Sequence, residues 1–145
     1  MTDVNTLLKL TQEKRASDLH ISVDNPPVVR VNGQLTTTDF PPLTQEAAKA
    51  LIYNMLNDEQ KAIFERDKEL DFSLALEGLE RFRVNVHIQK GSVEAAFRRI
   101  PQYVPSIHEL GLPPAIMDFA RRPSGLVLIT GPTGSGKTTT LAAMI

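Results

Sequence analysis

Residues 81–100 read RFRVNVHIQKGSVEAAFRRI, and this stretch decides the fold because its residues alternate in character. The apolar positions of its first nine residues share one face of a predicted strand: Phe82, Val84, Val86 and Ile88. The opposite face is polar and carries Arg81, Arg83, Asn85 and His87. A period of two is typical of a strand with one buried face. We therefore predict a strand over 81–89, a turn at 90–92 and a return strand over 93–100.

The residues before this hairpin extend the sheet and supply helices. Residues 17–23 and 69–76 alternate as strands, and residues 28–38 form a predicted hairpin. Its Asn32-Gly33 turn supplies the two positive φ angles of a tight hairpin. Apolar residues at helical spacing predict helices over 3–15, over 44–55 with Thr44 as N-cap, and over 58–66. The first 100 residues are thus expected to form an α+β domain with an antiparallel sheet.

Composition excludes several classes of protein. The formal net charge is −1 and the chain has no cysteine, which excludes a disulfide framework and a thiolate zinc site. The near-neutral charge gives no electrostatic case for nucleic acid as a partner. The N-terminus lacks an uninterrupted apolar core, and no apolar run approaches the length of a membrane span. A cytoplasmic location is therefore the expectation. Charge does vary locally, because residues 57–80 hold eight acidic and three basic residues, whereas 81–99 hold five basic and one acidic.

The sequence changes in character at Pro101. Five of the ten prolines lie between residues 101 and 125, among short helical pieces, so we interpret residues 101–122 as a linker. Residues 126–130, LVLIT, then form a continuous apolar run. Such a run predicts a strand buried on both faces, as in a parallel sheet covered by helices.

Residues 131–138, GPTGSGKT, match the phosphate-loop pattern G-x-x-x-x-G-K-[ST]. Glycines let successive backbone N–H groups point at phosphate oxygens, and the helix that opens near Lys137 adds its positive end. Lys137 is expected to reach the β- and γ-phosphates, and the Thr138 hydroxyl to ligate Mg²⁺. The predicted ATP-binding residues are Gly131, Pro132, Thr133, Gly134, Ser135, Gly136, Lys137, Thr138 and Thr139. The alternative is a glycine-rich turn that binds no nucleotide.

A phosphate loop by itself does not hydrolyse ATP. Enzymes of this class also need an acidic residue on a later strand and a carboxylate that orients water. Neither follows Ile145, and one strand with one helix cannot bury LVLIT. The expectation is therefore a chain cut inside its catalytic domain and inactive alone, namely the N-terminal part of a larger ATPase.

The ordered motifs of this chain resemble those of type IV pilus retraction ATPases of the PilT type, within the secretion ATPase superfamily. The motifs are ASDLHIS, PPVVRVNG, RFRVNV, FRRIP, HELGLP and GLVLITGPTGSGKTTTLAAM, spread from about Leu7 to Met144. Assembly and secretion ATPases of the superfamily usually carry a further domain before ASDLH. Here that stretch begins at Ala16, which favours retraction over extension.

The resemblance implies the organisation of the parent protein. Residues 1–100 would be a PAS-like N-terminal domain, 101–122 a linker, and 123–145 the first βα unit of a truncated RecA-like α/β P-loop domain. Six subunits would form a ring that hydrolyses ATP, with Mg²⁺, and acts on the pilus through an inner-membrane platform protein. The protein would be cytoplasmic and peripheral at that membrane, with no membrane span and no nucleic-acid partner.

The resemblance also implies catalytic roles for Arg83 and Arg98, beside Lys137. Arginines of the RFRVN and FRRIP motifs approach the nucleotide phosphates from the N-terminal domain, and Arg81 and Arg99 lie in the same motifs. From the residues alone, Arg83 lies on a polar strand face, where a guanidinium could pair with phosphate oxygens. The alternative is a solvated basic face that balances the acidic stretch before it. For Arg99, which falls on the side of Phe97, this alternative is kept.

Other polar residues receive structural interpretations. Asp18 and His20 share a strand face, where a hydrogen-bonded surface is expected rather than a metal site, because no third ligand has suitable spacing. Arg30 lies on the polar face of its hairpin and could contact another subunit. Two other functions remain open: a pilus extension or type II secretion ATPase, and a non-catalytic PAS-like interaction module.

Overall fold

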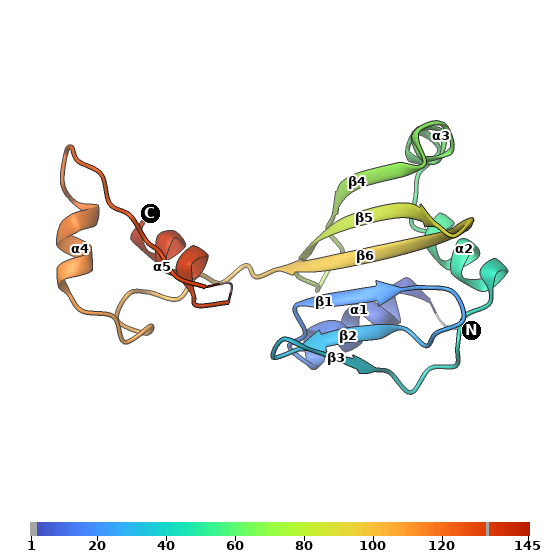
Figure 1. The fold of residues 1–145 in the computed structure, drawn as a ribbon, viewed down its shortest axis with the longest axis horizontal. Coiled ribbons are helices and arrows are strands. Elements are labelled where there is room, and N and C mark those ends of the chain that lie inside the picture. Colours follow the sequence, from blue (N-terminus) through green and yellow to red (C-terminus); the bar gives the residue numbers. More distant parts are fainter. Residues whose placement is uncertain (1–2, 133) are drawn as a thin grey trace. The chain divides into compact units, whose positions relative to one another are not determined.

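The computed structural model describes residues 3–132 and 134–145, and these divide into two compact units. The first unit runs to Pro101 and the second from Gln102 to Ile145. Figure 1 shows the strands gathered in the first unit, whereas the second unit contains helices and loops. Each unit is described by itself below.

One six-stranded sheet organises the first unit. Its strands are β1 (Asp18–Ile21), β2 (Val28–Val31), β3 (Gln34–Thr37), β4 (Glu69–Leu74), β5 (Arg81–Gln89) and β6 (Ser92–Ile100). The order across the sheet is β3-β2-β1-β6-β5-β4, and every neighbouring pair is antiparallel. Both predicted tight turns are present, since Asn32 and Gly33 have φ of 50° and 83°, and Lys90 and Gly91 have 49° and 80°. The pairing of β1 with β6 joins strands from opposite ends of this unit.

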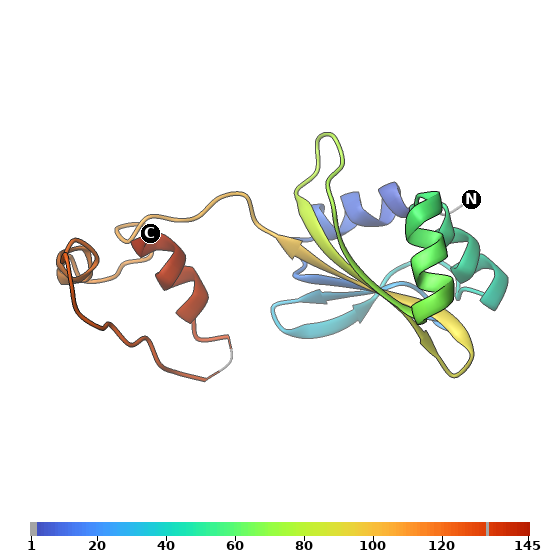
Figure 2. The ribbon, with the colours of Figure 1, turned by 90° about the horizontal axis from the view of Figure 1, so that it is seen from above.

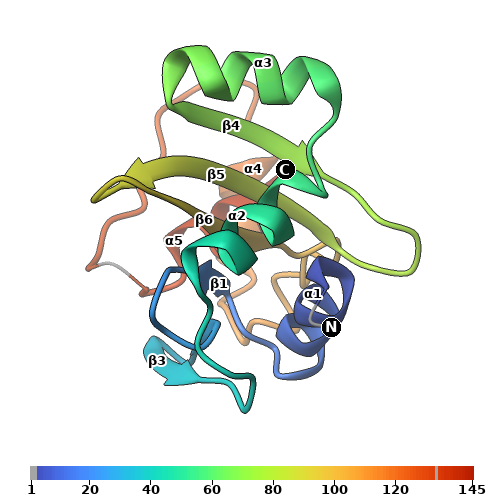
Figure 3. The same cartoon turned by 90° about the vertical axis from the view of Figure 1, so that its right-hand side faces the viewer.

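Three helices cover one face of the sheet (Figures 2 and 3). They are α1 (Val4–Glu13), α2 (Gln45–Tyr53) and α3 (Asp58–Asp67). A side chain caps each N-terminus: Asp3 accepts from the Thr6 amide, Thr44 from that of Ala47, and Asn57 from that of Gln60. These bonds satisfy amides that have no partner inside a helix, which fixes where each helix begins.

The core lies between the helices and this face of the sheet. Leu19, Phe82 and Phe97 come from three adjacent strands and are at most 1% exposed. Leu7 and Ile52 cover them from α1 and α2 and are fully buried as well. The alternation of 81–89 is therefore confirmed for its first three apolar positions. Ile88 differs, being 38% exposed at the far end of β5 beside the turn.

The second unit contains two short helices, α4 (Ala115–Ala120) and α5 (Lys137–Met144). The helix predicted after the phosphate loop is present, but the strand predicted over 126–130 is not. Leu126 and Leu128 are 83% and 75% exposed. A strand needs a neighbour to bond its backbone groups, and no described residues pair with 126–130. The prediction of a buried strand there was wrong for this structure.

Candidate functional site

The phosphate loop connects the extended residues 126–130 to α5. Gly131, Gly134 and Gly136 have φ of 153°, 81° and 86°, angles that residues with a Cβ seldom adopt. A Cβ at Gly131 would lie 2.7 Å from the Ser135 hydroxyl oxygen, a contact that rotation of the serine side chain would relieve, so the φ angle is the stronger requirement for glycine there. Thr133, predicted to bind nucleotide, lies outside the described residues. The described residues Gly131, Pro132, Gly134, Ser135 and Gly136 form a tight turn before the helix.

The start of α5 carries amides suited to an anion. Gly136 is the N-cap and offers no side chain, and the first turn holds no acidic residue. Thr140 donates the first helical hydrogen bond, to Gly136 O at 2.8 Å. The amides of Lys137, Thr138 and Thr139 precede it and have no partner inside the helix. Backbone N–H groups at the positive end of a helix can donate hydrogen bonds to phosphate oxygens.

Lys137 folds back onto its own loop. Its Nζ donates to the carbonyl oxygens of Gly131 at 2.8 Å and Pro132 at 2.6 Å. These contacts keep the ammonium group over the loop, where it could exchange carbonyl oxygens for phosphate oxygens. Thr138 follows it on α5 and is exposed, so its hydroxyl is accessible to a metal ion. These residues therefore fit a nucleotide phosphate with Mg²⁺.

The two predicted arginines lie on the sheet face opposite the helices. Arg83 on β5 pairs in register with Arg98 on β6, and Arg98 pairs with Asp18 on β1. Asp18 in turn pairs with Arg30 on β2. One row across four strands therefore reads Arg30, Asp18, Arg98, Arg83. The pairing of β1 with β6 brings together residues that are 80 positions apart in the sequence.

Asp18 is the buried member of this row. Its side chain is 10% exposed and forms ion pairs with Arg98 Nε at 3.0 Å and Arg30 Nε at 3.3 Å. The hydroxyl of Ser17 donates a third bond, at 2.8 Å. Burial opposes ionisation of Asp18, but hydrogen bonds from Ser17 and Arg98 outweigh it, so its pKa lies below the ordinary value. Asp18 is therefore a fixed negative charge between two arginines.

Arg83 is held differently. Its Nε and Nη2 donate to the Asp71 carboxylate of β4 at 3.3 and 3.5 Å, and the two side chains are 68% and 47% exposed. Such an exposed pair contributes little to stability, about 0–1 kcal/mol, so Arg83 can exchange Asp71 for another anion at small cost. Arg99 lies on the other side of β6, where Nη1 contacts Glu80 at 3.0 Å and the side chain is 19% exposed. Arg99 and Glu80 therefore form a structural ion pair.

His20 lies next to this row on β1. Its pKa is lowered by burial and by the charges of Arg30 and Arg98, against an opposing effect of Asp18. No group of three or more His, Cys, Asp or Glu residues in the described part of the chain could hold a metal ion. The ion pairs of Asp18 agree with a hydrogen-bonded strand surface.

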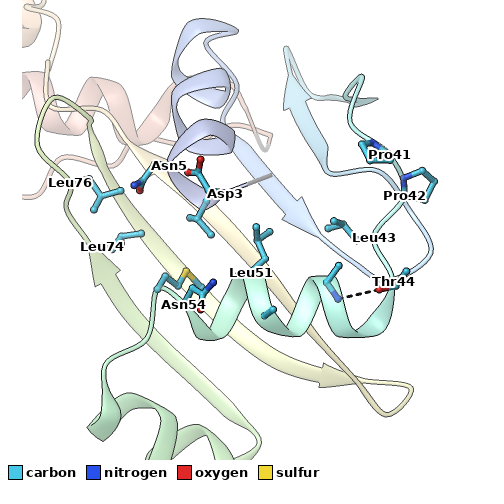
Figure 4. A pocket seen from close by; sticks show the side chains of 14 residues that line it. Asp3, Asn5, Pro41, Pro42, Leu43, Thr44, Leu51, Asn54, Leu74 and Leu76 are labelled. Carbon is cyan, nitrogen blue, oxygen red and sulfur yellow. Dashed lines mark hydrogen bonds between the residues drawn. The ribbon is translucent and has the colours of Figure 1, made fainter. Parts of the chain in front are cut away.

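A cavity on the helical side of the first unit has other chemistry. It measures about 840 Å³ and is bordered by α1, α2, the segment before α2, and the residues around the end of β4 (Figure 4). Its lining is mainly apolar, with Leu43, Leu51, Leu74 and Leu76 among the residues. Asp3 is its only ionisable described residue, and it caps α1. A pocket without a cation does not suit a phosphate.

The sequence matches the family model described as Type II/IV secretion system protein over residues 1–145. The chain belongs to this family. It is 46% identical, over 99% of its length, to the Pseudomonas aeruginosa protein named Type IV pilus retractation ATPase PilT. It is also 42% identical, over 82% of its length, to a Neisseria gonorrhoeae protein named Twitching motility protein. The chain spans only 42% and 32% of these two relatives.

Solved structures of similar proteins share the fold. A structure described as the pilus retraction motor PilT with bound ADP has a TM-score of 0.83 and 40% identity. The Legionella pneumophila ATPase DotB has a TM-score of 0.80 and 27% identity. Each match covers 99% of this chain and 42% of the other. The α+β sheet domain and the PilT-type resemblance are thereby confirmed. Within the described residues, no helix has the length and apolar character that a membrane crossing requires.

Proposed function

We propose that this secretion-family chain is part of a motor ATPase that retracts type IV pili and so drives twitching motility. The observation that carries the proposal is the 46% identity along 99% of the chain to a pilus retraction ATPase. The phosphate loop supplies the chemistry, because Gly131–Thr138 with α5 offers amides, an ammonium group and a hydroxyl to ATP and Mg²⁺. By analogy with the relatives' greater length, the activity requires further chain beyond these residues.

The proposed organisation follows the resemblance. Residues 1–100 would act as the PAS-like domain, 101–122 as a linker, and 123–145 as the start of a RecA-like ATPase domain. Six copies would form a ring in the cytoplasm, at the inner membrane, where a platform protein transmits motion to the pilus. In such a domain, strands absent from these residues would cover Leu126 and Leu128, which are exposed here.

In this proposal each site residue has a separate task. Bound Mg²⁺ would neutralise charge on the phosphate oxygens. Lys137 would leave the carbonyls of Gly131 and Pro132 to pair with the β- and γ-phosphates. The amides of Thr138 and Thr139 would bind phosphate oxygens, and the Thr138 hydroxyl would ligate the ion. Arg83 and Arg98 would stabilise negative charge that develops during phosphoryl transfer.

The experiment measures ATP hydrolysis by the full-length protein that carries this sequence, together with twitching of its host. Lys137→Ala should abolish both, because the ammonium group that pairs with the phosphates is lost. Lys9→Ala, on an exposed position of α1, is the matched control and should leave both unchanged. Normal hydrolysis by Lys137→Ala would overturn the assignment of the loop. Residues 1–145 alone should show no turnover.

A further inference from the structure

Asp18 is the residue through which Arg98 is oriented. Arg98 Nε donates to Asp18 Oδ1 at 3.0 Å, while Ser17 and Arg30 both engage Oδ2. The carboxylate is therefore fixed by three contacts, one from each strand that flanks β1 and one from Ser17, which precedes β1. Because Asp18 is 10% exposed and Arg98 is 74% exposed, a buried anchor holds an arginine whose far end reaches solvent.

The hydrogen bond to Asp18 uses the nitrogen of Arg98 that lies nearest the backbone. Neither Nη1 nor Nη2 of Arg98 bonds to any other described residue. A guanidinium held at Nε keeps its two terminal nitrogens free, and these can pair with two oxygens of one phosphate group. Arg83 differs, because Asp71 occupies its Nε and Nη2 at longer distances. Arg98 is thus oriented before an anion binds, whereas Arg83 must first break its hydrogen bonds to Asp71.

Charge in the row also favours an anion. Arg30 and Arg98 carry two positive charges against the one negative charge of Asp18, and Arg83 is balanced by Asp71. The row thus retains a net positive charge. Arg30 Nε contacts Asp18, and its Nη1 donates to the Gly33 carbonyl at 3.1 Å, which holds Arg30 within its own hairpin. Of the two arginines that contact Asp18, Arg98 is therefore the one that extends outward, at 74% exposed against 35% for Arg30.

We propose that Asp18 is a positioning residue that holds Arg98 by Nε and so keeps both of its terminal nitrogens available to the oxygens of a phosphate group. This inference rests on the proposed function, which supplies the nucleotide. Asp18 does not touch the nucleotide and acts only through Arg98. The exposed Asp71 does not contact Arg98 and provides the matched control for the Arg98 hydrogen bond.

The first test uses residues 1–145 and needs no nucleotide. In nuclear magnetic resonance spectra of arginine side chains, the Arg98 Nε–H should exchange with solvent about tenfold or more slowly than that of exposed Arg81, because a hydrogen bond protects it. Asp18→Asn should abolish the difference, and Asp71→Asn should leave it intact. An Arg98 signal that exchanges as fast as that of Arg81 in the unmodified chain would overturn the proposal.

The second test measures ATP hydrolysis by the full-length protein. Asp18→Asn should lower kcat about tenfold or more, since misplacing a catalytic group by about 1 Å is that costly, with KM changing less. Asp58→Asn, which removes an exposed ion pair with Lys61 on α3, should leave kcat within about twofold. In an Arg98→Gln background, Asp18→Asn should add no further loss, because the two residues act as one unit. A full additional loss there, or an unchanged kcat in Asp18→Asn alone, contradicts the proposal.

Two outcomes separate this inference from the proposed function. If Lys137→Ala and Arg98→Gln both retain normal hydrolysis, the proposed function fails and the positioning role fails with it. If both lose hydrolysis while Asp18→Asn does not, only the positioning role fails. Should Asp18→Asn not fold by circular dichroism, Arg98→Lys carries the test, since lysine keeps the charge but has no planar fork. Near-normal hydrolysis by Arg98→Lys would then exclude an oriented fork.

Discussion

Two apolar segments of this chain differ in solvent exposure. In β5, Phe82 and Val84 are 1% and 0% exposed, whereas Leu126 and Leu128 in the second unit are 83% and 75% exposed. The second segment is the more apolar, yet the first forms the strand. The two segments differ in their packing partners, because β5 lies between β4 and β6 and is covered by three helices. An apolar segment is stabilised by burial, but it becomes buried only where neighbouring elements pack against it.

The same comparison separates the two groups of candidate site residues, one in each unit. The arginines of the first unit lie on a sheet whose core fixes the strand register. The phosphate loop depends on local backbone angles and on α5, which has no fully buried residue. The sheet therefore orients side chains through long-range packing, and the loop arranges its amides through glycine.

The largest expected effect comes from leucine substitutions in the two units. Leu19→Ala should lower the free energy of unfolding by about 2–5 kcal/mol, because it leaves a cavity in a closed core. Leu128→Ala should change it by less than about 0.5 kcal/mol, because that side chain already meets water. Urea unfolding followed by circular dichroism measures both. Equal losses would mean that the two units do not differ in packing.

Much of the first unit could be predicted because its signals are local. The alternation of 81–89, the Asn32-Gly33 and Lys90-Gly91 turns and the Thr44 cap each act within a few residues. The absence of a strand over 126–130 could not be predicted in the same way. The apolar run indicates that the segment favours burial. Whether it is buried depends on other strands and helices, which the segment itself does not include.

The site shows the same division. The phosphate loop is a contiguous motif, so the sequence alone predicts Lys137 and Thr138 as nucleotide-binding residues. The alternation placed Arg83 on the polar face, and the structure agrees. The contact of Asp18 with Arg98 was missed, because it depends on the register of β1 against β6. The available signals were two polar positions facing outward on alternating strands, but one sequence does not state which strands pair.

A smaller effect concerns helix capping in the two units. Thr44→Ala should cost about 1 kcal/mol of unfolding free energy, because its oxygen accepts the Ala47 amide at the start of α2. Thr139→Ala on α5 is the matched control and should cost less than about 0.5 kcal/mol, because Thr139 is exposed and caps no helix. The comparison uses the same urea measurements. A larger loss for Thr139→Ala would indicate that α5 contributes to the cooperative unit.

The smallest expected effect is a pH dependence centred on His20. Burial lowers the pKa of His20 in the folded protein, with Arg30 and Arg98 acting in the same direction against Asp18. The unfolded chain therefore binds a proton first, near the ordinary histidine pKa of about 6.5. Stability that is present above this pH should be lost as pH falls toward the lower folded pKa. His20→Gln should consequently lose less stability than the unmodified chain between about pH 7 and pH 5.

The midpoint of urea unfolding, measured for both proteins at each pH, isolates this effect. Titration of the remaining groups contributes to both chains, so the difference between them reports His20. Equal losses would show that His20 reaches solvent in the folded protein, despite its place beside Asp18 on β1. A greater loss in His20→Gln would show that the attraction of Asp18 exceeds the combined effect of burial and the two arginines. That result would reassign Asp18 from a partner of arginines alone to a partner of the histidine as well.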